Sequence, residues 1–205
     1  MSSPRIPSWR ACLGGPGWRD ERGTQLVEFA VTLPLLMVFV VGIFDFSGAF
    51  TLKQKLTNAA RDAARAAAAE PATDLSLRLP ASVNDAFLAV KNYLATNQIN
   101  DCGIASGSSP TGLKWTFTAN GNGCVTPGLT LIINRGYYFP QTGAALPSVN
   151  CASQAVGSGQ TAVVGTCVSI HYAYKWRFGR VASLLGSAAS LPTQITATAV
   201  AMNEN

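Results

Sequence analysis

An uncharged and mostly apolar run, residues 29–44, constrains the fold of this chain more than any other feature. It lies between Glu28 and Asp45, and as a helix it would rise about 24 Å, which is shorter than a hydrocarbon core of roughly 30 Å. A membrane span therefore also needs the flanking residues 24–27 and 46–52. Both carboxylates then lie near its ends, where an ionisable group costs less than at mid-bilayer. On these facts alone the two acids could simply mark the water boundaries of a signal anchor.

Composition indicates one membrane span and one modest domain. The chain has 205 residues, 48% hydrophobic and 12% charged, and no second run is long enough to cross a membrane. The net charge of +5 is spread along the chain rather than gathered in a patch. This distribution argues against nucleic acid as a partner, and membrane lipid is the expected surrounding of the apolar run.

The cysteines indicate on which side of the membrane the domain lies. Basic residues flank the apolar run on both sides, so the positive-inside rule does not decide. Cys12 precedes the run, whereas four cysteines follow it: Cys102, Cys124, Cys151 and Cys167. An even number in a small domain predicts two disulfides and an oxidising compartment. We favour the sequential pairing, in which each bridge closes a short segment. A zinc site is the weaker alternative, because no C-x-x-C pair is present.

Residues 1–23 have the features of a leader rather than of a fold, being rich in Gly and Pro and without a periodic apolar face. A secretory signal would instead be cut after the apolar run, where Ser47-Gly48-Ala49 offers a small-x-small site before Phe50. That alternative stays open. Its difficulty is that the apolar run is longer than the usual h-region of a cleavable signal.

The leader ends at Gly23, Glu28 is the fifth residue after it, and an apolar helix follows. This order resembles type IV prepilins. The continuation "LVEFAVTLPLLMVFVVGIFDFSGAFTLKQKLTNAARDAARAAA" is similar to the TadE-like branch of minor pilins (pseudopilins) from tight-adherence (Tad) pilus systems. The Val-Glu-Phe-Ala core, Leu-Pro-Leu at 33–35 and Thr-Asn-Ala-Ala-Arg at 57–61 carry the resemblance, which is strong over residues 22–69. Asp45-Phe46 stands where the family more often has Glu-Phe.

The resemblance implies a subunit that a prepilin peptidase cuts between Gly23 and Thr24. It implies a cytoplasmic leader (1–23), a transmembrane helix (24–52), a periplasmic stalk helix (53–70) and an extracytoplasmic α+β domain (71–205). The implied location is the inner membrane, crossed once with the N-terminus in the cytoplasm, before entry into an extracellular pilus. Besides the peptidase, the implied partners are other minor pilins, the major pilin and the inner-membrane assembly platform. The expected assembly residues are Thr24, Glu28, Pro34 and Asp45. The alternative is a membrane-anchored or secreted adhesion module that never enters a fibre.

The pattern after Asp45 turns amphipathic and Ala-rich, and Pro71 should end the helix. A continuous helix from Thr24 would then be near 70 Å long. Pro34 should bend its membrane half, or be a tolerated kink without a role. The Ala run has two interpretations: helix propensity alone, or a small-residue face that lets neighbouring helices pack closely.

The region after Pro71 predicts an α+β domain of the general pilin plan, with the long helix packed on a small antiparallel sheet and one further helix. That helix starts at a capping Ser82, with Asp85 three residues later. Its apolar face is Val83, Phe87, Val90 and Leu94. Strands are expected in "GLKWTFTA", where Leu113, Trp115 and Phe117 alternate, in "GLTLIINRG", in "VSIHYAYKW" and from Gln194 to Met202. Residues 120–123 suit a hairpin turn.

The sequence contains no pattern typical of an active site. Carboxylates are few beyond Pro71, and H-E-x-x-H, G-x-S-x-G and G-x-x-x-x-G-K are absent from the sequence. We therefore predict no enzymatic activity, cofactor or metal, and a surface position for His171. Tyr172, Tyr174 and Trp176 alternate beside Lys175, Arg177 and Arg180. Such a stripe can stack nucleic-acid bases, but it is more often a core face with solvated neighbours.

Overall fold

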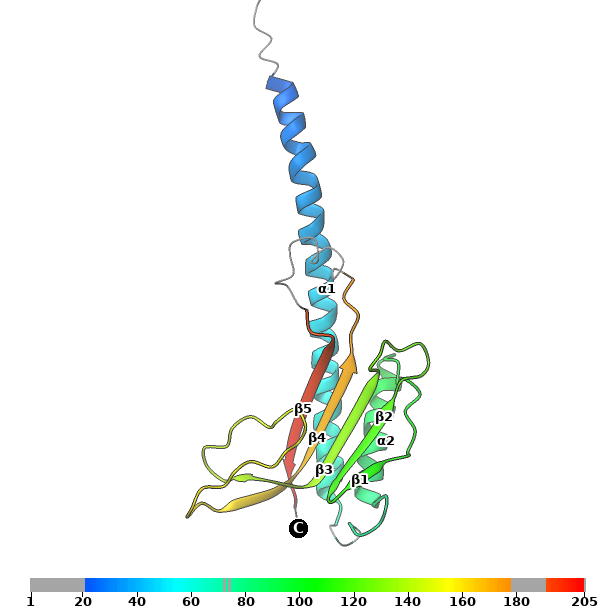
Figure 1. Cartoon of the computed structure of the whole chain (residues 1–205), viewed down its shortest axis with the longest axis vertical. Coiled ribbons are helices and arrows are strands. Elements are labelled where there is room, and N and C mark those ends of the chain that lie inside the picture. Colours follow the sequence, from blue (N-terminus) through cyan, green and yellow to red (C-terminus); the bar gives the residue numbers. More distant parts are fainter. Residues whose placement is uncertain (1–20, 72, 74, 178–190, 205) are drawn as a thin grey trace, which may run out of the picture. The chain divides into compact units, whose positions relative to one another are not determined.

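A computed structural model of the chain describes residues 21–71, 73, 75–177 and 191–204. Most of the predicted leader, with Cys12, and also Arg180 lie outside the described residues. The elements are α1 (Glu21–Ala69), α2 (Ala81–Thr96), β1 (Ser109–Thr111), β2 (Lys114–Ala119), β3 (Leu129–Pro140), β4 (Ala162–Ala173) and β5 (Gln194–Met202) (Figure 1). One long N-terminal helix, one further helix and an antiparallel sheet confirm the predicted α+β, pilin-like fold class.

The chain divides into two compact units, residues 1–40 and 41–205. In the described part of the first unit every residue is helical, Pro34 included. Its large apolar side chains, such as Leu26, Phe29 and Val31, are exposed. By length and composition α1 is able to cross a membrane. It begins at Glu21, which is a few residues before the expected start at Thr24, and it ends one residue before Glu70.

The second unit holds a five-stranded meander in the order β1-β2-β3-β4-β5, with every neighbouring pair antiparallel. The strands expected in "GLKWTFTA", "GLTLIINRG" and "VSIHYAYKW" correspond to β2, β3 and β4, and the last predicted strand is β5. Residues 120–123 lie in the connection between β2 and β3, as a hairpin requires. β1 was not predicted, because its three residues, Ser-Pro-Thr, are all exposed and show no alternation.

One face of the sheet forms the main core together with both helices, which lie on that face (Figure 1). Alternate residues of the strands point into this core. They are Trp115 and Phe117 of β2, Leu129, Leu131 and Ile133 of β3, Val168 and Ile170 of β4, and Ile195, Ala197 and Ala199 of β5. The predicted face of α2, Val83, Phe87, Val90 and Leu94, is buried against them, which confirms that interpretation.

Two local predictions were wrong. Ser82 does not cap α2, because the N-cap residue is Pro80 and no side chain caps the helix. The Ser82 side chain is instead buried within the first turn, without a hydrogen-bond partner among the described residues. Leu113 lies just before β2 and is 43% exposed, so the inward alternation starts only at Trp115.

The Ala-rich face of α1 packs within the chain's own core. Ala59, Ala60, Ala63, Ala64 and Ala67 are buried and belong to the same core cluster as the sheet and α2. Small side chains let the helix backbone approach the sheet closely. The structure therefore uses the small-residue face inside the subunit rather than leaving it free for another chain.

The C-terminal end of α1 is held by a buried arginine from β3. The register between β3 and β4 shifts between Asn134 and Tyr137, so Arg135 and Gly136 form a bulge. Arg135, 1% exposed, donates through Nη1 to the carbonyl oxygen of Ala67. Its Nη2 donates to the carbonyl oxygen of Glu70 at 2.8 Å. These carbonyls lie at the end of the helix, where backbone acceptors lack intrahelical partners. Arg135 therefore caps α1 together with the backbone N–H of Glu70, which donates to the same Ala67 carbonyl oxygen at 3.3 Å.

The structure has the disulfides Cys102–Cys124 and Cys151–Cys167, with Cα–Cα distances of 5.4 and 5.6 Å. This is the sequential pairing that the sequence favoured. The first joins the segment after α2 to the β2–β3 connection. The second ties the β3–β4 connection to the outer face of the sheet, where Cys151, Cys167, Ile132 and Tyr137 form a smaller buried cluster.

Candidate processing and assembly site

Gly23 and Thr24, the predicted cleavage pair, lie within the first turns of α1, and both are exposed. A Cβ atom built on Gly23 would meet no atom within 4 Å. The fold of this chain therefore does not require glycine at position 23. Any requirement for glycine there must come from a protein that contacts the segment.

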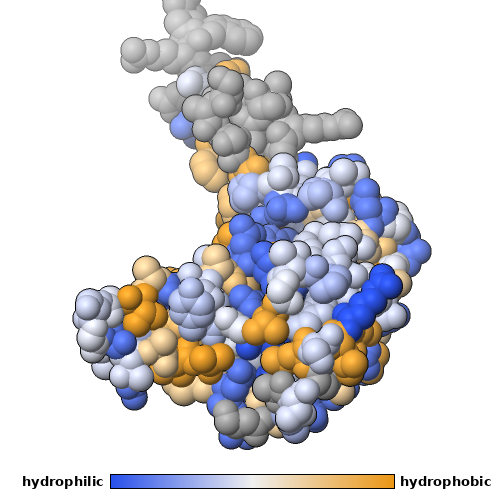
Figure 2. Space-filling view, turned by 60° about the horizontal axis from the view of Figure 1, so that its bottom comes forward, coloured by the Kyte–Doolittle hydropathy of each residue, from blue (hydrophilic) through white to orange (hydrophobic). Residues whose placement is uncertain are grey.

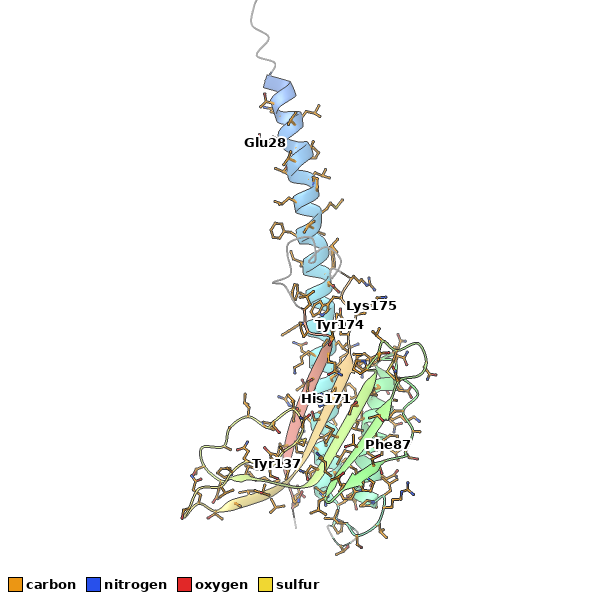
Figure 3. All side chains as sticks on the ribbon, viewed as in Figure 1. Glu28, Phe87, Tyr137, His171, Tyr174 and Lys175 are labelled. Atoms are coloured by element: carbon orange, nitrogen blue, oxygen red, sulfur yellow. A yellow bond between two sulfur atoms is a disulfide. The ribbon has the colours of Figure 1, made fainter. Side chains whose placement is uncertain are left out.

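Glu28 is the only ionisable residue between Gly23 and Phe44. Its side chain is exposed on the helix (Figure 3), and it makes no hydrogen bond or ion pair with the part of the chain that the structure describes. Its exposed neighbours Leu26, Val27 and Phe29 are apolar. A carboxylate on an apolar helix surface is costly in lipid unless another group balances its charge. Thr24 lies one helical turn away.

Pro34 is an exposed residue inside α1. Two residues before it, the Thr32 hydroxyl donates to the carbonyl oxygen of Phe29 at 3.2 Å. The roles of Pro34 and Glu28 in assembly stay predictions, because both depend on other subunits.

Asp45 has a partner inside the chain. It is 4% exposed, and the hydroxyl of Tyr174 donates to its Oδ1 at 3.2 Å and lies 3.3 Å from its carbonyl oxygen. Tyr174 directly follows β4 and lies beside α1 (Figure 3). A Cβ on Gly48 would come within 3.3 Å of the same hydroxyl, so the small residue gives Tyr174 room. Asp45 thus fastens α1 to the end of β4, while its assembly role stays a prediction.

An aromatic cluster extends this contact. The rings of Tyr174 and Trp176 lie 4.9 Å apart, and the ring of Trp176 lies 5.1 Å from that of Phe46 on α1. The indole Nε1 of Trp176 donates to the carbonyl oxygen of Pro192 at 2.6 Å. Tyr172, Tyr174 and Trp176 all pack against the main core, while Lys175 and Arg177 are exposed. The stripe is therefore a core face with solvated neighbours, as we had interpreted it.

The Tyr174 hydroxyl should titrate at unusually high pH. Partial burial, and next the charge and hydrogen bond of Asp45, raise its pKa above the ordinary 10.0, while Arg177 lowers it. Because the pKa is higher in the folded state than in the unfolded state, the contribution of this group to stability is complete below pH 10. That contribution is lost as the pH rises through the folded-state pKa. We expect Asp45→Asn to lower the pKa of Tyr174. The measurement is tyrosinate absorbance against pH, with Tyr174→Phe subtracted to isolate this residue. An unchanged titration in Asp45→Asn would contradict the contact.

His171 lies on the outer face of the sheet and is half-buried rather than freely exposed. Its Nε2 is 2.8 Å from the carbonyl oxygen of Val149 and 3.3 Å from the Ser169 hydroxyl. These contacts hold the β3–β4 connection against the sheet. Among the described residues there is no group of three or more His, Cys, Asp or Glu side chains suited to a metal ion.

Comparison with known proteins is informative for the helix. Residues 23–65 match the model of the family described as TadE-like protein. No significant match was found among curated proteins or among solved structures. The match starts at Gly23, includes Glu28 and Asp45, and ends within the Ala-rich part of α1. The resemblance inferred from the sequence is thus confirmed: residues 23–65 are similar to the TadE-like family, and the chain has a pilin-like α+β architecture.

Proposed function

We propose that the chain is a minor pilin, or pseudopilin, of a tight-adherence pilus machine. The TadE-like match suggests a Tad pilus-associated protein of a structural, non-enzymatic family. In the proposal a prepilin peptidase cuts after Gly23, and the subunit stays in the inner membrane with its domain in the periplasm. It then joins other minor pilins and the major pilin through the assembly platform, and contributes to pilus assembly and surface adhesion.

The observation that carries the proposal is Glu28, exposed on an otherwise apolar helix at the fifth position after Gly23. In an anchor that only holds a domain at a membrane, a carboxylate there could serve only to mark the water boundary. Removal of residues 1–23 creates an α-amine on Thr24, whose unperturbed pKa is about 7.7 to 8.0. In a bundle of parallel helices the amine of one subunit would lie within reach of Glu28 of the next.

Gly23→Val tests the processing step. The structure has room for a side chain at Gly23, so the variant should fold and insert as the natural chain does. The valine should obstruct the approach of the peptidase, and the full-length form should accumulate in cells that contain the peptidase. Gly107→Val is the matched control, since a Cβ there also meets no atom within 4 Å. Normal shortening of Gly23→Val, measured by intact mass, would exclude cleavage by a prepilin peptidase.

The alternative, an adhesion module that stays outside the fibre, has one observation in its favour. The β3–β4 connection carries Leu146, which is 92% exposed. Near it lies a groove of about 240 Å³, lined in part by Tyr137, Phe139 and Pro147. The face of the domain seen in Figure 2 has separate hydrophobic patches among hydrophilic residues. Fractionation of sheared pili decides between the two functions, because only a pilin is recovered with the fibre.

A further inference from the structure

We infer that the end of the domain nearest Asp45 is a membrane-docking surface that binds the headgroup region of an anionic bilayer. The inference rests on the proposed membrane anchoring of α1. We call this surface the collar and define it by three aromatic residues, Phe46, Phe50 and Trp176, and three basic residues, Lys53, Lys175 and Arg177.

The collar begins where the lipid-spanning part of α1 must end. Asp45, Ala49, Leu52 and Leu56 follow helical spacing, and all four are buried or partly buried against the domain. Folded protein therefore covers one side of the helix at Asp45 and beyond, and Gly42, one turn earlier, is also buried. The residues before it, 24–44, would rise about 31 Å as a helix, which matches a hydrocarbon core of roughly 30 Å. We therefore place the water boundary near Asp45, one of the boundaries that the sequence allowed, whereas the transmembrane helix expected from the resemblance extends to Leu52.

Two aromatic residues of the collar, Phe46 and Phe50, are exposed although they belong to the folded unit, and Trp176 is half-buried. Phe46 is 53% and Phe50 is 65% exposed. Together with Lys53 they follow helical spacing, so they share one face of α1. Between this face and the start of β5 lies a groove of about 640 Å³, lined in part by Phe46, Phe50, Trp176 and Ile195. Tryptophan is typical of the membrane–water interface, where its amphipathic ring lies at headgroup level, which is the position proposed for Trp176.

The charge of the collar fits an anionic surface. Lys53, Lys175 and Arg177 are exposed, and Tyr174 and Lys175 lie next to α1 in Figure 3. The acidic residue next to the collar, Asp45, is buried and hydrogen-bonded to Tyr174. Lys53 donates to the carbonyl oxygen of Thr196 on β5, which brings its charge to the rim of the groove. Basic residues close to an anionic leaflet are attracted to it, and the attraction falls off within a Debye length.

Fluorescence quenching by brominated lipids tests the inference on the full chain. The chain is reconstituted in vesicles of phosphatidylcholine alone or with phosphatidylglycerol, both brominated close to the headgroup. The difference between the natural chain and Trp176→Phe isolates Trp176 from the other tryptophans. We expect Trp176 to be quenched, and more strongly when phosphatidylglycerol is present.

A charge-pair variant separates docking from folding. The double variant Lys175→Gln with Arg177→Gln should lower the ratio of docked to undocked chain by roughly tenfold or more. Quenching of Trp176 should then no longer depend on phosphatidylglycerol. Arg61→Gln with Arg65→Gln is the matched control, because both arginines are exposed on α1 away from the collar. The control pair should keep that dependence.

Three results would contradict the collar, and they differ in what they imply for the membrane anchor. Chain that floats with the vesicles while Trp176 stays unquenched in both lipids overturns the collar and leaves the membrane anchor standing. Trp176 that is shielded from aqueous iodide only at high protein-to-lipid ratio assigns the surface to a second copy, which also overturns the lipid assignment. Chain that fails to float overturns the collar and the proposed anchoring together.

Discussion

Arg135→Met is expected to lower the free energy of unfolding of the domain by about 3 to 5 kcal/mol. The side chain is 1% exposed, and its guanidinium donates to the carbonyls of Ala67 and Glu70, to the Thr166 hydroxyl at 2.8 Å and to Asn203 Oδ1 at 3.2 Å. Methionine fills much of the volume but donates nothing. The buried acceptors would lose a charged donor, and a positive charge would leave the negative end of the α1 dipole.

The measurement is denaturant unfolding of the full chain in detergent, followed by the fluorescence of the tryptophans, which include the buried Trp115. Arg135→Lys should fall between the natural chain and Arg135→Met, because lysine keeps the charge but lacks the forked geometry. Arg65→Met is the control at an exposed arginine of α1, where we expect the free energy of unfolding to change by no more than about 0.5 kcal/mol. Equal midpoints for Arg135→Met and Arg65→Met would show that Arg135 does not hold the helix end.

Glu28→Ala should permit membrane insertion and some cleavage, and should prevent recovery of the subunit with the other pilus components. An ion pair in a low-dielectric setting adds little net stability, but an unpaired member costs on the order of 3 to 5 kcal/mol. The charged glutamate therefore avoids this cost only beside a neighbouring helix that supplies a positive charge. This asymmetry would set the stagger between subunits, as buried polar groups set register in other helix assemblies.

Glu28→Gln keeps the size of the side chain and loses its charge, so we expect it to fail nearly as badly as Glu28→Ala. Thr32→Val is the control, an exposed position one turn further along that carries no charge. The measurement is co-purification of the major pilin and the other minor pilins with each variant. Recovery at the natural level for both Glu28 variants would make Glu28 a boundary marker only.

Much of the fold could be predicted because local patterns determine it. Alternation located β2 and β4, and the apolar spacing of Val83, Phe87 and Val90 located α2. The bulge at Arg135 could not be predicted, because it depends on the register between two strands, which local alternation does not encode. Without the bulge, no pattern indicates that an arginine inside an apolar strand reaches the end of α1.

The two acids that bound the apolar run show the same limit for the candidate site. The inward position of Tyr174 followed from the alternation in "VSIHYAYKW", but its partner Asp45 lies 129 residues away in the sequence. Proximity in the fold gives that aspartate its role. Glu28, in contrast, has no partner among the described residues. Its predicted role, like those of Gly23 and Thr24, depends on proteins outside this chain and stays a prediction.

The N-terminal sequence of the protein extracted from membranes of cells that contain the peptidase tests the proposed processing most directly. We expect the sequence to begin at Thr24, which would create the α-amine that Glu28 is proposed to pair with. A sequence that begins at Phe50 would show cleavage of a secretory signal and release of the domain. A sequence that begins at Met1 would show an uncut signal anchor, and either result would contradict the assignment as a processed pilin.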